Sequence, residues 1–166
     1  MTEPSICAAS LMGALPMPPP AGNILNNLPR RVLIDAGPII AYLRQNDQFH
    51  EWTVRQFEHF PEFVTCDAVL AEACARLNYF GLKQSAVIDL LATKVLRVDF
   101  DSNLKADRVA TLMKKYADAG MDFADACLVA MAEQVADSLV VTLDTKDFSV
   151  YRRHERQVVP FLAPPK

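Results

Sequence analysis

Short apolar runs alternate with longer segments of helical periodicity along most of the chain. Four short runs rich in β-branched and aromatic residues predict buried strands at 31–36, 63–66, 95–100 and 140–143. Six longer segments carry apolar residues at helical spacing, at 38–43, 49–60, 68–80, 83–93, 104–119 and 124–136. A last run, 158–161, contains Pro160, which restricts it to an edge strand. Strands that alternate with helices in this way predict a parallel sheet covered by helices on both faces.

Residues 1–29 differ in composition from the rest of the chain. The sequence LPMPPPA occupies 15–21, and Pro29 ends the segment. Proline at this density disfavours both helix and sheet. The segment has no basic start, and Pro16 interrupts its apolar part, which argues against a signal peptide. We therefore expect a loosely ordered extension over 1–29 and one domain over 30–166.

The composition indicates what kind of protein this is and which partners are expected. Hydrophobic residues make up 51% and charged residues 22%, which is typical of a globular protein. No apolar run approaches the ~20 residues that span a bilayer, so we expect no membrane partner. The net charge of −3 means that any nucleic-acid binding must use a local basic patch. The cysteines form no C-x-x-C pair, which predicts reduced thiols in a cytoplasmic protein.

Acidic residues fall where the predicted sheet would bind a ligand. Asp35 ends the first strand and Asp144 follows the fourth. Ligands of open α/β sheets bind at the carboxyl ends of the strands, where the strand order reverses. Glu72 lies in the first two turns of the helix after the second strand, and Asp125 begins the helix before the fourth. All four carboxylates are therefore expected at one edge of the sheet.

A cluster of carboxylates predicts a bound cation, because ionised carboxylates repel one another in a cleft. Mg²⁺ and Mn²⁺ both prefer oxygen ligands, and such an ion activates water for attack on phosphorus. The chain has no serine or cysteine nucleophile motif and no glycine-rich phosphate loop. Hydrolysis by water is thus favoured over a covalent intermediate.

Each acidic residue also has a purely structural explanation. Asp122 and Asp125 have the spacing of an N-cap and a first-turn residue. The others fit turn, cap or exposed helix positions equally well: Asp35, Glu72, Asp144 and Asp147. Only their common placement favours a functional site. The three histidines have no metal-ligand spacing and are interpreted as structural or exposed.

Four blocks of sequence resemble one known family. DAGPIIAYL at 35–43, followed by DQFH at 47–50, and TCDAVLAEA at 65–73 make up the first two. YADAGMDFADACLVAMAE at 116–133 and VVTLDTKDFSVYR at 140–152 make up the others. Together they resemble the PIN-domain ribonucleases, and most closely the VapC-type toxins of bacterial type II toxin–antitoxin systems.

The resemblance implies a fold, an activity and a set of site residues. The fold would be a three-layer α/β/α sandwich with a central parallel sheet of four to five strands. The activity would be Mg²⁺- or Mn²⁺-dependent cleavage of RNA. Thr142 matches the family's usual hydroxyl, while Asp122 and Asp147 match acids that support the ligands. The family's catalytic, metal-binding acids match Asp35, Glu72, Asp125 and Asp144.

The resemblance also implies partners. A toxin of this kind would act on RNA in the cytoplasm, pair with a cognate antitoxin protein and form a homodimer. The proline-rich segment before Arg31 is a departure, because family members usually begin close to the first strand.

A basic cluster follows the last predicted site residue. Arg152, Arg153 and Arg156 are close in sequence to Asp144, so we predict that they bind RNA phosphates. A solvated turn near the carboxyl end explains the same residues.

Three other functions compete with a toxin. The chain could instead be a PIN-fold nuclease of RNA processing, which the sequence does not distinguish. It could be an inactive binding module, although all four acids are present. A phosphatase of the haloacid dehalogenase type needs a second aspartate two residues after the first, where this chain has Gly37.

Overall fold

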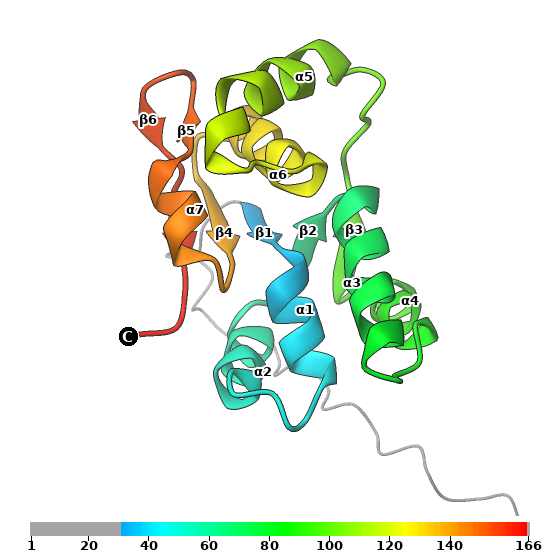
Figure 1. Ribbon diagram of the computed structural model, residues 1–166. Helices are drawn as coiled ribbons and strands as arrows, with labels where there is room; N and C mark the ends of the chain where they lie inside the picture. Colours follow the sequence, from blue (N-terminus) through cyan, green and yellow to red (C-terminus); the bar gives the residue numbers. More distant parts are fainter. Residues whose placement is uncertain (1–30, 166) are drawn as a thin grey trace, which may run out of the picture.

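A five-stranded parallel sheet forms the centre of the fold (Figure 1). The computed structural model describes residues 31–165, so the extension expected over 1–29 lies outside the described residues and stays a prediction. The strands lie in the order β3 (Leu96–Val98), β2 (Phe63–Thr65), β1 (Arg31–Ile34), β4 (Ser138–Val141) and β7 (Phe161–Leu162). The predicted parallel sheet of four to five strands is confirmed.

Helices cover the sheet and complete the predicted three-layer α/β/α sandwich. Figure 1 shows α5 and α6 on one side of the sheet and α1 and α2 on the other. Helix α3 packs against both α1 and α6. The bounds are α1 Ala36–Leu43, α2 His50–His59, α3 Asp67–Tyr79, α4 Ser85–Ala92, α5 Ala106–Lys115, α6 Phe123–Gln134 and α7 Thr145–Val150. No helix among residues 31–165 has the length and apolar character needed to cross a bilayer.

The strand order places β1 and β4 side by side at the centre of the sheet. The chain runs from β1 to β2 and β3 on one side and then returns to the other side of β1 as β4. Ile34 pairs with Val141, and the Asp35 amide donates to the Val141 carbonyl at 3.0 Å. The residues that follow these two strands therefore emerge together at the reversal of strand order, where α/β proteins bind ligands.

The core fixes the two elements that carry most of the acidic residues. Leu33, Ile34, Val140 and Val141 are fully buried, as expected for strands covered on both faces. Helix α6 is buried over nearly its whole length, from Ala124 to Ala132 apart from one partly exposed residue, Asp125. Burial of each large apolar side chain stabilises the folded state by about 1.5–3 kcal/mol. The start of α6 is consequently held firmly above the sheet.

The chain near its carboxyl end differs from the prediction. The expected single strand at 158–161 is divided: Gln157–Val158 (β6) pairs antiparallel with Arg152–Arg153 (β5), and only Phe161–Leu162 joins the sheet. Pro160 lies between the two strands. It has no N–H to donate to a neighbouring strand, so a continuous strand is interrupted at this residue.

An ion-pair network attaches this hairpin to the α5–α6 layer. Arg108 forms two hydrogen bonds with Glu133, at 2.9 and 2.7 Å, and a third with Glu155 at 2.7 Å. Lys115 also donates to Glu155 at 2.9 Å. An ion pair with two parallel hydrogen bonds, like that of Arg108 and Glu133, is stronger than an ordinary surface ion pair.

Two predicted helices also differ at their ends. The first begins at Ala36 rather than Pro38, with Asp35 as its N-cap. Proline is accepted in this first turn because the amides there have no partner within the helix. The helix predicted over 104–119 is shorter and is followed by a separate 3₁₀ turn, Ala117–Ala119.

Candidate active site

Asp35 is held between the first helix and the fourth strand. Its Oδ1 accepts a hydrogen bond from the Ala36 amide at 2.7 Å, and its Oδ2 accepts one from Thr142 Oγ1 at 2.8 Å. Thr142 is fully buried and also accepts from the Asp144 amide at 3.0 Å. A single hydroxyl thus fixes Asp35 relative to the backbone of Asp144.

A pocket of about 470 Å³ opens beside these residues. Glu72 of α3 also lines this pocket and forms an ion pair with Arg76 at 3.7 Å. Three acids from three separate elements therefore line one pocket. The full lining is Asp35, Gly37, Glu72, Arg76, Leu143, Asp144, Thr145 and Lys146.

Asp122 and Asp125 form the start of α6. Asp122 accepts from the Asp125 amide at 2.8 Å, and Asp125 accepts in return from the Asp122 amide at 3.4 Å. This reciprocal arrangement is a capping box, which satisfies two amides at the helix terminus. Asp125 Oδ2 also accepts from the hydroxyl of Tyr151 at 3.0 Å. The structural explanation of these two acids is therefore correct, and it leaves them free for a second role.

The acids raise one another's pKa. Burial raises the pKa of Asp35 to about 6, and the negative charges of Glu72 and Asp122 add to the effect. Burial and the charge of Asp122 raise the pKa of Asp125 to about 7. The pKa of Glu72 is raised by burial and by the charges of Asp122 and Asp125. All of these groups are consequently near enough for their charges to interact.

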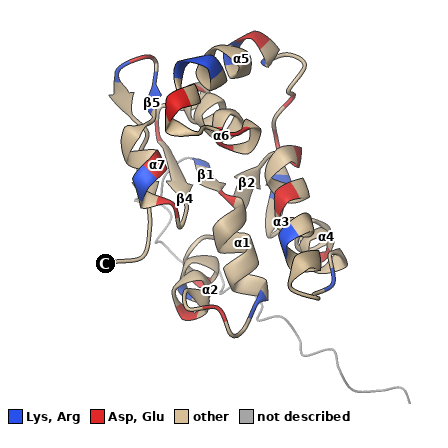
Figure 2. Cartoon of the chain, viewed as in Figure 1, with Lys and Arg blue, Asp and Glu red and all other residues tan. Residues whose placement is uncertain are grey.

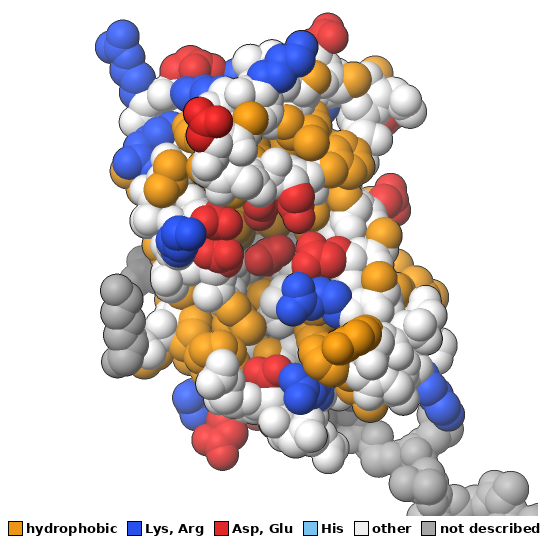
Figure 3. Space-filling view, in the orientation of Figure 1, with side chains coloured by type: hydrophobic (Ala, Val, Ile, Leu, Met, Phe, Trp, Pro, Cys, Tyr) orange, Lys and Arg blue, Asp and Glu red, His pale blue; other side chains and the backbone are white. Residues whose placement is uncertain are grey.

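The surface view agrees with this arrangement. Figure 2 shows acidic residues on α3, at the end of β1 and in the connection from β4 to α7. In Figure 3, acidic side chains form a cluster across the middle of one face, with basic side chains at its border. The four predicted site acids are therefore divided between the pocket, for Asp35, Glu72 and Asp144, and its neighbouring helix start, for Asp125.

The chemistry of the donors fits a hard divalent cation. The acidic side chains of the site offer only carboxylate oxygens, which suit Mg²⁺ and Mn²⁺. Within residues 31–165, no three acidic, histidine or cysteine side chains already surround a common point as a complete metal site. The donor types therefore fit the ion, while a ligand set for it stays a prediction.

Comparison with known proteins identifies the family. The family model of the PIN domain matches residues 32–153. The chain belongs to the PIN-domain family. Among solved structures, it is similar to the Mycobacterium tuberculosis toxin VapC20, which cleaves the sarcin–ricin loop. The TM-score is 0.60 with 19% identity over 70% of this chain and 92% of VapC20, a likeness in fold. No curated protein sequence matches the chain.

Three residues of this PIN domain were not predicted from the sequence. Arg76 follows Glu72 by four positions, a spacing that places both on one helix face and that could have shown the ion pair. Lys146 lines the pocket from the first turn of α7. Tyr151 reaches Asp125 only because α7 returns the chain toward α6, and no sequence pattern indicates this contact.

The three arginines predicted to bind RNA have different environments. Arg152 Nη1 donates to three carbonyls at the end of α7, and Arg153 Nη1 donates to the Ala132 carbonyl and to Ser138 Oγ. Arg156 is exposed in the hairpin. Binding of RNA by these residues stays a prediction, and of the three Arg156 has the most exposed side chain.

Replacing Tyr151 by Phe tests whether its hydroxyl supports the site. The ring packs against Tyr116 and Phe148, with centroid distances of 5.3 and 5.5 Å, so removal of the hydroxyl alone should leave the fold intact. The hydrogen bond lowers the pKa of Asp125, so its loss should raise that pKa and shift the pH–activity profile upward. Outer partners of metal ligands typically contribute about 10- to 100-fold to activity or metal affinity. An unshifted profile at full activity would show that the hydroxyl is dispensable.

Proposed function

We propose that this chain is a metal-dependent endoribonuclease that uses water to cleave RNA phosphodiester bonds. The observation that carries the proposal is the convergence of Asp35, Glu72 and Asp144 on one pocket at the reversal of strand order, in a member of the PIN-domain family. The three acids come from the β1–α1 junction, α3 and the β4–α7 connection, so local sequence does not account for their proximity.

The proposed roles follow from the contacts. Asp35, Glu72, Asp125 and Asp144 would hold Mg²⁺ or Mn²⁺. Such an ion, when bound, activates water and stabilises negative charge on phosphate. Thr142 fixes the orientation of Asp35, Tyr151 holds Asp125, and Asp122 holds the start of α6. Asp147 donates its backbone amide to Asp144 at 2.9 Å, which orients that carboxylate.

Purified protein and single-stranded RNA test the activity directly. We expect cleavage in the presence of Mn²⁺ or Mg²⁺ and none after chelation of the ion. An inactive binding module would bind RNA under both conditions without cutting it, and that result would overturn the proposal.

Arg76 and Lys146 are the proposed contacts for RNA phosphate. Both line the pocket that holds the acids, and each would offset the repulsion between phosphate and carboxylates. Neutralising either, as Arg76→Gln or Lys146→Gln, should weaken RNA binding. It should also lower the slope of log affinity against log salt by about 0.7, the value for one lost single-strand phosphate contact.

Arg55→Gln is the matched control, because Arg55 is exposed on α2 and does not line the acidic pocket. Arg156→Gln, measured in the same way, tests the prediction made from the sequence. Equal slopes for wild type, Arg76→Gln and Lys146→Gln would exclude the proposed contacts.

We further propose that the nuclease is the toxin of a toxin–antitoxin pair and acts in the cytoplasm. The fold likeness to VapC20 and the sequence blocks that resemble VapC-type toxins support this. Expression of the chain should arrest growth, and co-expression of a short antitoxin encoded beside its gene should restore growth. Normal growth during expression of active enzyme would favour a nuclease of RNA processing. The homodimer implied by the resemblance stays a prediction.

A further inference from the structure

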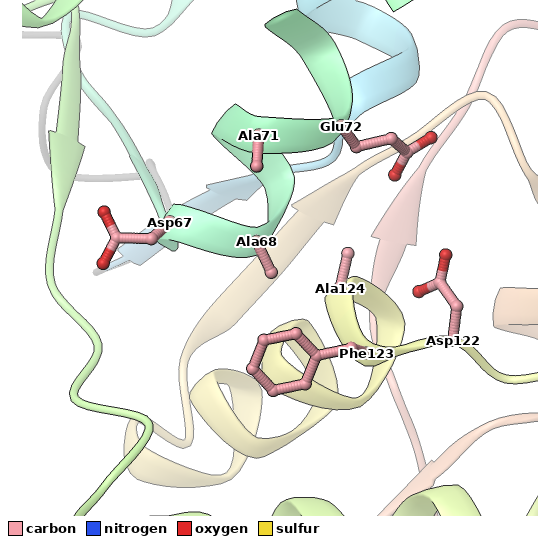
Figure 4. Close-up of a pocket in the computed structure, with 7 residues that line it drawn as sticks. All are labelled: Asp67, Ala68, Ala71, Glu72, Asp122, Phe123 and Ala124. Atoms are coloured by element: carbon pink, nitrogen blue, oxygen red, sulfur yellow. The ribbon is translucent and has the colours of Figure 1, made fainter. Parts of the chain in front are cut away.

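A second hollow, of about 510 Å³, adjoins the acidic pocket between α3 and α6. Glu72 lines both hollows, so the two are neighbours at this side chain. Figure 4 shows Glu72 and Asp122 at one end of the second hollow and the ring of Phe123 at the other, below Ala68. The remaining lining consists of Asp67, Ala71 and Ala124.

The shape of this hollow depends on small residues around one aromatic ring. Ala68, Ala71 and Ala124 carry only methyl groups, so they leave a shallow apolar surface. Phe123 is 46% exposed, although it is the first residue of the most buried helix in the fold. Full burial of a phenylalanine would contribute about 1.5–3 kcal/mol, of which a half-exposed ring obtains only part. Phe123 thus offers an uncovered aromatic face at the edge of the alanine surface.

The charges of the hollow define what that ligand can be. Its charged residues are all acidic: Asp67, Glu72 and Asp122. A phosphate would be repelled here, whereas the acidic pocket that shares Glu72 also offers Arg76 and Lys146. A flat, uncharged group suits the alanine surface and the exposed ring. Unstacked bases of single-stranded RNA are flat and uncharged, and proteins bind them by stacking on aromatic side chains.

We propose that the hollow between α3 and α6 binds one unstacked RNA base, which stacks on Phe123 and lies next to the nucleotide whose phosphate enters the acidic pocket. The proposal rests on the nuclease function proposed above. The shared residue Glu72 sets the spacing, because its side chain borders both the base site and the phosphate site. Cleavage would then require an RNA segment whose bases are free to leave the stack.

The test compares Phe123→Ala, Phe123→Trp and Ile88→Ala in the full chain. The substrate is a single-stranded RNA oligonucleotide that wild-type protein cuts at one position, selected from a random-sequence pool. Phe123→Ala should lower kcat/KM by about 5- to 150-fold, the range for loss of one stacked base. Phe123→Trp should retain activity. Ile88→Ala is the matched control, since Ile88 is 51% exposed on α4 and lines neither hollow.

Abasic substrates separate stacking from a loss of structure. One abasic residue is moved stepwise through the oligonucleotide, and kcat/KM is measured for wild type and Phe123→Ala. At one position beside the cut, the abasic residue should impair wild type by the same factor as the Phe123→Ala change and should not impair the variant further. A general structural defect would instead give additive losses at every position.

The outcomes distinguish this proposal from the one on which it rests. Additive losses, or equal kinetics of Phe123→Ala and wild type, would overturn the base site and leave the nuclease intact. Equal kinetics together with weaker antitoxin binding by Phe123→Ala would assign the ring to a protein contact and overturn the proposal. Absence of RNA cleavage by wild type with Mn²⁺ would overturn both.

Discussion

Replacing Asp35 by Asn is expected to reduce metal-dependent RNA cleavage by at least about 100-fold, because even outer partners of metal ligands contribute about 10- to 100-fold. Asp35 lies between the Ala36 amide and the Thr142 hydroxyl, and it lines the pocket beside Glu72 and Asp144. Asparagine has nearly the same volume and keeps one oxygen, but it removes the negative charge. Cleavage of a labelled RNA with Mn²⁺ gives the measurement.

Stability separates loss of chemistry from loss of fold. In metal-free protein, the ionised form of Asp35 is disfavoured by burial, so the neutral Asn variant should melt at the same temperature as wild type or higher at about pH 8. Asp89→Asn is the matched control, because Asp89 is exposed on α4 and lines neither hollow. An Asp35→Asn variant that cuts RNA at the wild-type rate would exclude Asp35 from the active site.

The second large effect is a rise in melting temperature on binding a divalent metal, and its size is expected to depend on pH. Mg²⁺ or Mn²⁺ should raise the melting temperature strongly at about pH 8 and little at about pH 5. At the higher pH the acids of the site are ionised and repel one another, so a cation is stabilising. At the lower pH, protons already neutralise Asp35 and Asp125, whose pKa values are about 6 and about 7, and the ion must displace them.

The same pKa values determine how the stability of the metal-free protein changes with pH. Between about pH 4 and 7, folded protein binds more protons than unfolded protein, because both carboxyls have raised pKa values. Stability should therefore fall as pH rises through this range. For Asp35, a rise from 3.8 to about 6 corresponds to roughly 3 kcal/mol.

Calorimetry or a thermal-shift assay can measure both effects. At a metal concentration about tenfold above Kd, binding contributes roughly 1.4 kcal/mol, or a rise of about 3–6 °C in Tm. The Asp35→Asn variant should lose most of this rise. An equal rise at both pH values would contradict the proposed role of the acids.

The sequence was sufficient to predict the positions of Asp35 and Asp144. Each follows a short strand that ends in buried apolar residues, and parallel strands with helical connections bring their carboxyl ends to one edge. Their proximity then depended only on β1 and β4 being neighbours, as the register of Ile34 with Val141 shows. Glu72 and Asp125 were predictable for a related reason, since each lies in the first two turns of a helix that starts at that same edge.

The contacts of Tyr151 and the exposure of Phe123 could not be predicted from the sequence. The tyrosine hydroxyl meets Asp125 across 26 positions, through a helix of six residues whose direction the sequence does not specify. Phe123 starts a helix that is mostly apolar, so the sequence pattern indicates that its ring is buried. The arginines of the hairpin were predicted as a basic cluster for RNA, although Arg152 and Arg153 donate to backbone carbonyls. Each of these features depends on how separate elements pack together.

The short edge strand β7 supports the acidic pocket indirectly, through hydrogen bonds to the backbone of Val140 and Thr142. The Leu162 carbonyl accepts from the Thr142 amide at 3.0 Å, and the Pro160 carbonyl accepts from the Val140 amide at 2.9 Å. The residue that joins Asp35 to Asp144 is thus itself anchored by a two-residue strand. Any partner that displaced β7 from β4 would release the backbone of Thr142 and would loosen the link between Asp35 and Asp144 without contacting a carboxylate.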